Sequence, residues 1–252
     1  MLGLGIDSGS TVTKGALFDG EKVVRRLMIP TKSNPKKSIR LVYDSLISDD
    51  VGFAVSTGYG RALLEKAGKQ VTEITCHAKG ASFLCPEART VIDIGGQDCK
   101  AIKLDQMGSV SDFIMNDKCA AGTGRFVEIM LKALELESGD LDDAVLNASP
   151  VSITSMCAVF AESEMISLLA SGEREQDIAA GIVHSICRRT AVFASKLNPE
   201  GPVFFSGGLA GYNCFRSFLE KYVGLKTVVH EDSQFAGAIG ASIIAYSCLM
   251  KG

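Results

Sequence analysis

The chain has almost no excess charge of either sign and few prolines. Its 252 residues carry 26 basic and 29 acidic side chains, a net charge of −3, with 6 Pro. A chain so close to neutrality has no electrostatic footprint for nucleic acid or for an anionic membrane, so we expect neither partner. An apolar fraction of 46% and a charged fraction of 22% exclude a disordered, collagen-like or coiled-coil chain. What remains is a globular protein.

The N-terminus lacks the features of a secretory signal. Residues 1–7 contain no basic residue and already reach Asp7, so we expect the chain to stay in the cytoplasm. A stretch of 18 residues without a charge, 233–250, approaches the length of a membrane-spanning helix. Gln234 and the serines, glycines and alanines dilute its apolar character, which favours a buried core helix over a membrane span.

None of the cysteines forms a CxxC pair. The 8 cysteines are spread from Cys76 to Cys248, and an intracellular chain uses cysteines as thiols or metal ligands more often than as disulfides. The lack of CxxC spacing excludes a zinc ribbon and a self-contained iron–sulfur motif. Any metal site must therefore be assembled from cysteines that lie far apart in the sequence.

Two segments share one pattern, an apolar strand followed by a turn of small residues and a second strand. They cover residues 2–14 and 90–100, and in each an Asp is followed by Gly at +2 and by Lys at +7. A later pair of segments, 52–60 and 202–210, repeats an apolar strand that ends in a Ser/Gly turn before a helix-like stretch. The duplication predicts an α/β protein of two related halves.

The repeat also predicts the domain boundaries. We expect a first lobe formed by residues 1–86 together with 233–252, and a second lobe formed by residues 87–232. The second lobe is longer because it carries an additional segment, at about 110–175, that contains Cys119 and Cys157. The closing stretch is expected to be helical and to pack on the first lobe.

The glycine-containing turns are suited to binding phosphate. Glycine lets the backbone approach a phosphate, and consecutive N–H groups in such a turn attract an anion. Asp7 and Asp93 each end the first strand of their segment, and we expect them to face each other across a cleft and hold Mg²⁺ with waters and substrate phosphates. Neither a P-loop pattern nor a GxGxxG that opens a helix after a strand is present, which argues against P-loop and Rossmann folds.

The residues expected to bind a nucleotide lie in four loops. The catalytic residues are expected to be Asp7 and Asp93. The residues expected to hold phosphate are Gly9, Ser10, Thr11, Val12, Thr13 and Lys14 in the first loop and Gly95, Gly96, Gln97 and Asp98 in the second. The residues expected to leave room for adenine and ribose are Gly207, Gly208, Leu209, Gly237, Ala238 and Ile239. Any one of these loops fits an ordinary turn equally well, and the occurrence of all four in this order favours a nucleotide site.

These motifs carry a resemblance to a known family. Asp7-x-Gly9-Ser10-Thr11 and Asp93-x-Gly95-Gly96 resemble the two phosphate motifs of the actin-like ATPase superfamily. Within it, residues 116–126 and 157–164 resemble the activator component (component A) of 2-hydroxyacyl-CoA dehydratases and the ATPase subunits of benzoyl-CoA reductases, the BadF/BadG/BcrA/BcrD type. The likeness extends over almost the whole chain, including residues 56–61 and 76–83. It implies an actin-like, ribonuclease H-like fold of two lobes around a cleft for ATP or ADP with Mg²⁺.

The resemblance further implies an ATP-dependent one-electron reductase activator. Such a protein is a homodimer with one [4Fe–4S] cluster between its subunits. The resemblance implies that it takes an electron from reduced ferredoxin or flavodoxin and passes it, driven by ATP hydrolysis, to a dehydratase or CoA-ester reductase.

The resemblance maps the cluster ligands onto Cys119 and Cys157. Each is followed by a helix-like stretch, 124–136 and 159–170, the latter ending at Gly172, and a helix N-terminus stabilises a thiolate. Two thiolates per chain cannot complete the Cys₄ shell of a cubane, whereas a two-fold dimer supplies four.

Alternatives remain open for the cysteines and for the activity. Cys119 or Cys157 taken alone fits a buried structural thiol, and a zinc ion bridged across a dimer is another alternative. The other six cysteines, together with His77 and His184, are expected to be structural. A small-molecule kinase of the same superfamily would use the same loops but needs a sugar or carboxylate pocket, for which both halves look too short. The second alternative is an ATP-switched binding protein without a cluster.

Overall fold

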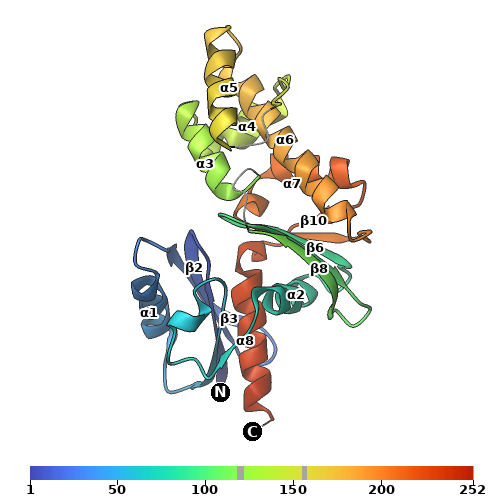
Figure 1. The fold of residues 1–252 in the computed structure, drawn as a ribbon. Helices are drawn as coiled ribbons and strands as arrows, with labels where there is room; N and C mark the ends of the chain where they lie inside the picture. The colour runs from blue at the N-terminus through green and yellow to red at the C-terminus, as the bar shows by residue number, and fades with distance from the viewer. Residues whose placement is uncertain (118–121, 155–157, 252) are drawn as a thin grey trace. The chain divides into compact units, whose positions relative to one another are not determined.

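The computed structural model describes residues 1–117, 122–154 and 158–251. The chain divides into two compact units, which are described separately (Figure 1). The first unit comprises Met1–Val91, Ile102–Phe113 and His230–Gly252, and the second comprises Ile92–Ala101 and Ile114–Val229. The lobe boundaries expected from the sequence repeat stay a prediction.

The first sheet has the strand order β3-β2-β1-β4-β5. Its strands are β1 (Leu2–Ser8), β2 (Val12–Phe18), β3 (Val23–Pro30), β4 (Val51–Thr57) and β5 (Lys69–Gln70). The helices of this unit are α1 (Pro35–Leu46), α2 (Glu73–Leu84) and α8 (Ala236–Leu249), with the short 3-10 helices η1 (Arg61–Leu63) and η4 (Ser233–Phe235). Because β1 pairs antiparallel with β2 and parallel with β4, the sheet is mixed.

Helix α1 covers one face of this sheet. Asn34 caps its N-terminus by accepting a hydrogen bond from the N–H of Lys37, and Pro35 occupies the first helical position. The side chains that α1 buries against β1 and β2 recur with the helical period; they are Ile39, Val42, Tyr43 and Leu46. This amphipathic spacing explains why the segment folds as a helix on an apolar sheet.

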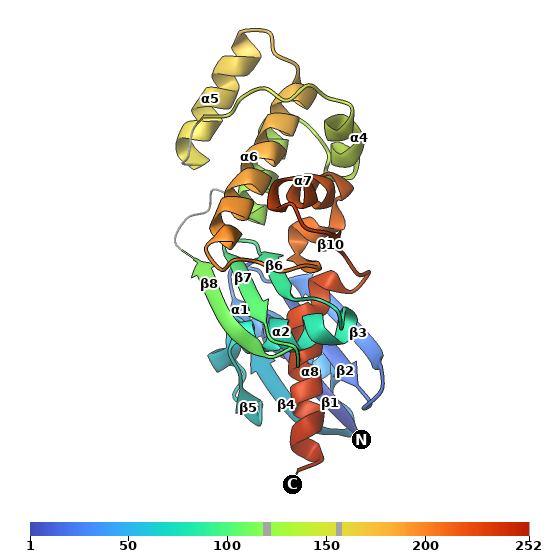
Figure 2. The ribbon, with the colours of Figure 1, turned by 90° about the vertical axis from the view of Figure 1, so that its right-hand side faces the viewer.

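The closing stretch of the chain forms the core helix that the sequence predicts, α8. It packs against α2, as both ribbon views show (Figures 1 and 2). Glycine permits this packing: a Cβ on Gly5 of β1 would overlap the backbone of α8 at Ala238, and a Cβ on Gly240 would overlap the carbonyl of Cys76 in α2. None of the helices in the described part of the chain has both the length and the apolar character that a bilayer crossing requires.

The second sheet has the strand order β10-β9-β6-β7-β8. Its strands are β6 (Thr90–Ile94), β7 (Cys99–Leu104), β8 (Val110–Asn116), β9 (Val203–Gly207) and β10 (Thr227–Val228). Read from its other edge, this order matches that of the first sheet, with β6 in the place of β1 and β9 in the place of β4. The duplication predicted from the sequence is therefore present in the topology.

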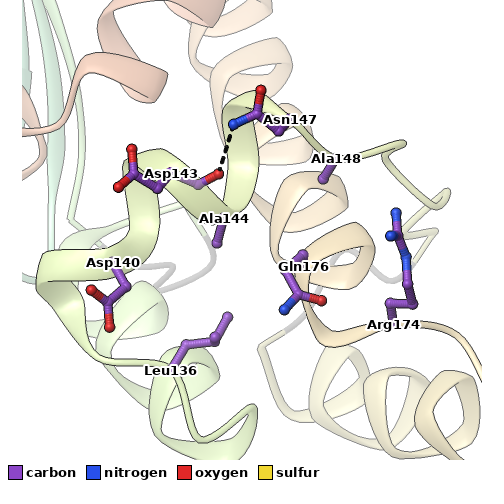
Figure 3. Close-up of a pocket in the computed structure, with 8 residues that line it drawn as sticks. All are labelled: Leu136, Asp140, Asp143, Ala144, Asn147, Ala148, Arg174 and Gln176. Atoms are coloured by element: carbon purple, nitrogen blue, oxygen red, sulfur yellow. Dashed lines mark hydrogen bonds between the residues drawn. The ribbon is translucent and has the colours of Figure 1, made fainter.

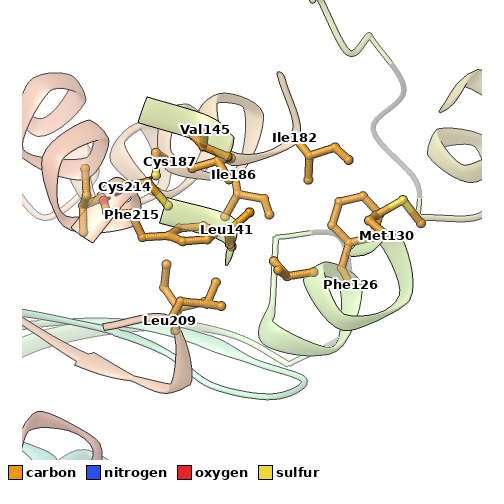
Figure 4. Close-up of a cluster of buried hydrophobic side chains, with 14 of the residues drawn as sticks. Phe126, Met130, Leu141, Val145, Ile182, Ile186, Cys187, Leu209, Cys214 and Phe215 are labelled. Atoms are coloured by element: carbon orange, nitrogen blue, oxygen red, sulfur yellow. Dashed lines mark hydrogen bonds between the residues drawn. The ribbon is translucent and has the colours of Figure 1, made fainter. Parts of the chain in front are cut away.

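The helices of the second unit surround one long helix, α6. They are α3 (Gly124–Ala133), α4 (Leu141–Leu146), α5 (Ala158–Ala170), α6 (Glu175–Ser195) and α7 (Asn213–Val223), with the 3-10 helices η2 (Ser138–Asp140) and η3 (Gly208–Gly211). Helix α6 contacts α3, α4, α5 and α7 (Figure 2). The apolar faces of these helices meet in a core that includes Phe126, Met130, Leu141, Ile186 and Phe215 (Figure 4).

Two helices occur where the sequence predicts helix-like stretches after cysteines. Helix α3 begins at Gly124, as expected, but ends at Ala133, because Glu135 adopts a positive φ of 55°. Helix α5 ends at Ala170, and Gly172 follows with a φ of 90° and an N–H that donates to the carbonyl of Leu169 at 3.0 Å. This is a left-handed C-terminal cap, as the glycine predicts.

Candidate functional site

The two predicted phosphate loops are tips of hairpins closed by the same hydrogen bond. In the β1–β2 hairpin, the N–H of Gly9 donates to the carbonyl of Val12 at 3.1 Å. In the β6–β7 hairpin, the N–H of Gly95 donates to the carbonyl of Asp98 at 2.9 Å. The shared Asp-x-Gly spacing thus corresponds to a shared turn geometry in the two units.

In the first unit, Asp7 of β1 lies in register with a lysine on one neighbouring strand and a threonine on the other. Lys14 of β2 is its antiparallel partner and Thr57 of β4 its parallel partner. Directly opposed residues project from the same face of a sheet, and all three are buried. The row lies at the carboxyl ends of the parallel strands β1 and β4, where open α/β sheets bind their ligands.

The Asp7 carboxylate is bordered by two glycines. A Cβ on Gly58 would lie 2.6 Å from Oδ1, and a Cβ on Gly237 would lie 2.7 Å from Oδ2. Gly58 also has a φ of 84°, which side chains other than glycine rarely adopt. His77 of α2 borders the same Gly237, so Asp7 sits among backbone atoms and an imidazole.

A buried hydroxyl beside Asp7 fits a site for an oxygen-rich ligand. In the described part of the chain, Thr57 Oγ1, on the same face of the sheet as Asp7, is buried without a hydrogen-bond partner, as is Ser8 Oγ, which lies on the other face next to Gly60. A buried polar group left without a partner costs about 1–3 kcal/mol, which a ligand or its waters can offset. The Cys76 thiol is near Thr57 but does not meet hydrogen-bond geometry, and burial raises its pKa to about 12, so it stays protonated.

In the second unit, the equivalent Asp93 is already bound by side chains of the chain itself. Lys100 Nζ donates to Oδ1 at 3.3 Å, and Ser206 Oγ donates to Oδ2 at 2.7 Å. Lys100 also pairs with the carboxylate of Asp98. Lys100 and Asp93 are almost fully buried, and a buried charge without a partner would strongly destabilise the fold. The ion pair therefore balances the negative charge of Asp93.

The backbone of the second loop binds the start of α3. The N–H of Gly124 donates to the carbonyl of Gly95 at 2.9 Å, and the N–H of Arg125 donates to the carbonyl of Gly96 at 2.9 Å. The first N–H groups of a helix have no partner within it, and the side chain of the N-cap residue Thr123 makes no capping hydrogen bond here. The loop therefore caps the helix.

The remaining predicted nucleotide residues are placed in different surroundings. Ser10 and Gln97 are exposed in the hairpin turns, and Gly208 is exposed at the start of η3. Gly207 has a φ of 91°, and a Cβ there would overlap the carbonyl of Ile94. The side chains that face the core instead of the surface are those of Leu209, Ala238 and Ile239. Their contact with a nucleotide stays a prediction.

The predicted cluster ligands, Cys119 and Cys157, lie outside the described residues. The six described cysteines take part in no disulfide, and all but the half-buried Cys248 are buried. Among residues 1–117, 122–154 and 158–251, no group of three or more His, Cys, Asp or Glu side chains is placed to hold a metal ion.

Three polar residues outside the predicted set make hydrogen bonds that the sequence analysis did not anticipate, two of them with Asp93. Ser206 and Lys100 bind Asp93, as described above. Glu164 of α5 accepts hydrogen bonds at Oε1 from both the N–H and the hydroxyl of Thr154, at 2.9 and 2.8 Å. The sequence contained a signal for both residues that bind Asp93. For Ser206 it was the Ser/Gly turn at 206–208, and for Lys100 it was the spacing from Asp to Lys. Glu164 had none, because its partner precedes it by ten residues in an irregular segment.

A surface depression of about 560 Å³ lies in the second unit between the end of α3, α4 and the start of α6 (Figure 3). It is lined by Leu136, Asp140, Asp143, Ala144, Asn147, Ala148, Arg174 and Gln176. Arg174 donates hydrogen bonds from Nε and Nη2 to the carboxylate of Asp177, at 2.7 and 2.9 Å. This pairing holds the pKa of Asp177 below its usual range. None of the predicted nucleotide residues is among the described residues that line it.

The fold defines the class of the protein. Two mixed sheets with matching strand orders, each with helices, form a two-lobed α/β fold that is also seen in ROK-type kinases. A solved ROK family glucokinase from Streptomyces griseus, bound to glucose and AMPPNP, superposes with a TM-score of 0.60, covering 98% of this chain and 100% of the kinase. At 11% sequence identity this likeness concerns the fold alone.

The sequence defines the family. The profile of the BadF/BadG/BcrA/BcrD ATPase family matches residues 4–245, and the chain belongs to that family. The (R)-2-hydroxyglutaryl-CoA dehydratase activating ATPase of Acidaminococcus fermentans is 41% identical over 256 residues, with 98% of each chain covered. The solved activator of the 2-hydroxyisocaproyl-CoA dehydratase from Clostridium difficile, with bound ADPNP, has a TM-score of 0.92 at 38% identity, covering 100% of this chain and 96% of that one. The resemblance found in the sequence is thereby confirmed.

Proposed function

We propose that the chain is an ATP-dependent activator that passes a low-potential electron to a 2-hydroxyacyl-CoA dehydratase or a related CoA-ester reductase. The observation that carries the proposal is the likeness to a nucleotide-bound dehydratase activator, which covers 100% of this chain and 96% of that one. The family membership and the paired hairpins support the ATPase part of it.

The loop of each hairpin contributes to binding Mg·ATP in this proposal. Residues 9–14 offer N–H groups, hydroxyls and the Lys14 amine to phosphate oxygens, and residues 95–98 offer the second set of N–H groups. Asp7 and Asp93 organise Mg²⁺ and the attacking water. The buried hydroxyl of Thr57, which lies beside Asp7 without a partner, supports the role of Asp7, whereas the charge of Asp93 is already balanced by Lys100. Residues 207–209 and 237–239 lie next to adenine and ribose.

We further propose that Cys119 and Cys157 of two chains hold one [4Fe–4S] cluster in a homodimer, which supplies the one-electron chemistry. Helix α5 begins directly after Cys157, and α3 begins five residues after Cys119, so helix N-termini follow both thiolates. The absence of disulfides among the six described cysteines supports a reducing compartment, the cytoplasm.

Energetics explain why ATP is needed. One electron moved across about 59 mV corresponds to roughly 1.4 kcal/mol, so a shift of a few hundred millivolts needs several kcal/mol. A helix N-terminus contributes only about 0.3–1 kcal/mol, and it favours the more negative, reduced cluster. Helix ends alone therefore do not make a strong reductant. Hydrolysis of ATP by water to ADP and phosphate makes the transfer from reduced ferredoxin or flavodoxin to the partner directional.

The proposal is tested by activating a partner enzyme. The anaerobically purified chain is mixed with a 2-hydroxyacyl-CoA dehydratase, dithionite and Mg·ATP, and dehydration of the acyl-CoA is followed. We expect activation with ATP and none with ADP. The double variant Cys119→Ser/Cys157→Ser should lose the iron chromophore and the activation while still binding nucleotide. ATP-dependent phosphorylation of a sugar or carboxylic acid, or activation by the double variant, would contradict the proposal.

A further inference from the structure

We infer that the hydroxyl of Thr57 holds one water molecule against the carboxylate of Asp7, in position to attack the terminal phosphate of ATP. The inference rests on the nucleotide role proposed above for Asp7, and it adds a residue that lies outside the predicted site. Because Thr57 acts through the water, it is a positioning residue.

The register of the first sheet places Thr57 for this role. Thr57 ends β4 as the parallel partner of Asp7 in β1, and directly opposed residues project from the same face of a sheet. The pair lies at the carboxyl ends of both strands, where open α/β sheets bind their ligands. Thr57 is 0% exposed and Asp7 is 6% exposed. A small molecule bound by both side chains is therefore shielded from bulk solvent.

The Thr57 hydroxyl has a hydrogen-bonding capacity that the fold leaves unused. Among the described residues, Oγ1 has no hydrogen-bond partner, and a buried hydroxyl without a partner destabilises the folded state. A hydroxyl both donates and accepts, whereas the ionised carboxylate of Asp7 only accepts. A water that donates one proton to the carboxylate can still bind the hydroxyl. One water thus satisfies both groups.

Two glycines keep side chains away from the carboxylate. A Cβ on Gly58 would lie 2.6 Å from Asp7 Oδ1, and a Cβ on Gly237 would lie 2.7 Å from Oδ2. Gly58 directly follows Thr57, and its φ of 84° is a conformation that other residues rarely adopt. The pair Thr57-Gly58 therefore places a hydroxyl beside Asp7 and leaves the adjacent oxygen without a side chain next to it.

The second unit contains the same two groups in a closed arrangement. Ser206 precedes Gly207, which has a φ of 91°, just as Thr57 precedes Gly58. Ser206 Oγ donates to Asp93 Oδ2 at 2.7 Å, so its proton is already used within the chain. The Thr57 hydroxyl makes no such bond to any described residue. Of the two hydroxyls, that of Thr57 is the one left to bind a water.

The hydrolysis step uses only the water and the nucleotide as reactants. The water oxygen forms a bond to the γ-phosphorus while the bond from this phosphorus to the β,γ-bridging oxygen breaks, and ADP leaves with that electron pair. One proton of the water stays on the new phosphate oxygen, and the other passes to solvent. Thr57 and Asp7 keep their protonation states, and their contribution is to orient the attacking oxygen.

The variant Thr57→Val tests the inference on the full, anaerobically purified chain. Valine keeps the shape of the side chain without its hydroxyl and suits a strand. We expect kcat for ATP hydrolysis to fall about tenfold or more, because one hydrogen bond to the water is lost. The KM for ATP and the calorimetric affinity for Mg·AMPPNP should stay within about threefold of wild type. The melting temperature without nucleotide should be unchanged or higher by about 2–4 °C, since an unsatisfied buried group is removed.

Two further variants serve as matched controls. Thr57→Ser keeps the hydroxyl and should retain kcat within about threefold of wild type. Ser56→Ala removes the neighbouring buried hydroxyl, which donates to the carbonyl of Arg61 at 2.9 Å. That variant should lower the melting temperature by about 2–4 °C and leave kcat unchanged, because its hydroxyl has a partner and faces away from Asp7. If Thr57→Val does not fold, Thr57→Ala replaces it.

Each outcome decides the inference. An unchanged kcat in Thr57→Val overturns it and leaves the proposed function standing. A loss of AMPPNP affinity of about tenfold also overturns it, since that result would place the hydroxyl on a phosphate oxygen instead of a water. So does a melting temperature that falls together with kcat and is restored by serine without recovery of kcat. Wild-type protein that neither binds nor hydrolyses ATP overturns the proposed function together with the inference, so the two failures are distinguishable.

Discussion

The β1–β2 and β6–β7 hairpins have the same turn, but the contacts of the aspartate and of the loop differ between them. Asp7 in the first lies against the backbones of Gly58 and Gly237, whereas Asp93 in the second is bound by Lys100 and Ser206. The first loop is hydrogen-bonded within its own sheet, and the second loop caps a helix. The two copies of the motif keep one turn conformation, and the residues that surround them make different contacts.

The difference between the two lysines is expected to have the largest effect. Lys100→Met leaves Asp93 and Asp98 without their buried partner and should lower the free energy of unfolding by roughly 3–5 kcal/mol. Lys14→Met should mainly weaken nucleotide binding, because its proposed role is to contact phosphate. Urea denaturation and calorimetric titration of both variants measure the two effects. If the two variants lost the same stability, Lys14 and Lys100 would not differ in the way that the structure indicates.

The strained turn of the second unit is expected to come next. Gly207→Ala forces a side chain onto a φ of 91° and against the carbonyl of Ile94, and should cost about 2–3 kcal/mol of stability. Its neighbour provides the matched control: a Cβ on Gly208 would meet nothing within 4 Å, so Gly208→Ala should change stability by less than about 0.5 kcal/mol. The melting curves of the two variants should therefore separate clearly, and coinciding curves would show that the turn carries no strain.

The capping of α7, which follows the same turn, should have a moderate effect that depends on pH. Asp142 of α4 accepts hydrogen bonds from the N–H groups of Asn213 and Cys214 at 2.9 and 2.8 Å. Burial raises the pKa of Asp142, but these donors outweigh it and hold the pKa below its usual value. Asp142→Ala should cost about 1–2 kcal/mol at pH 7.

The sign of the pH dependence follows from the lowered pKa. The contribution of Asp142 is fully present above the unfolded value of about 3.9 and is lost as the pH falls through the lower folded value. The deficit of Asp142→Ala should therefore shrink when urea denaturation is repeated near pH 3. Asp143→Ala, on the exposed side of α4, is the control, and a deficit that persists at low pH would refute the capping role.

The smallest effect is expected at the side chain of Arg125. Its ion pair with Glu128, at 3.2 Å, is exposed on both sides, and such pairs contribute about 0–1 kcal/mol. Arg125→Ala should therefore leave stability within about 0.5 kcal/mol of wild type in chemical denaturation. A larger loss would mean that the side chain, and not only the backbone, joins α3 to its surroundings.

Local features of the fold were predictable because they depend on neighbours in the sequence. The hairpins follow from Asp-x-Gly between apolar strands, the start of α3 from the helix-like stretch 124–136, and the end of α5 from Gly172. The correspondence between the two sheets followed from the duplication, whereas the order of their strands was not predicted. The end of α3 was missed because Glu135, not a glycine, adopts the left-handed conformation there.

The long-range contacts of the candidate site were not predictable in the same way. Ser206 reaches Asp93 across 113 positions of sequence, and no local pattern encodes such a contact. The capping of α3 by the second loop involves only backbone atoms, which leave no signature in side-chain types. Ala238 and Ile239 were expected to border a nucleotide from their small or apolar character, and the structure shows that this character also serves the core.

The proposed electron-transfer function is tested most directly by iron and sulfide analysis of the anaerobically purified chain, combined with its native mass. The account predicts a brown homodimer with one [4Fe–4S] cluster for every two chains. A monomer, or a dimer that is saturated with nucleotide and free of iron and sulfide, would contradict it.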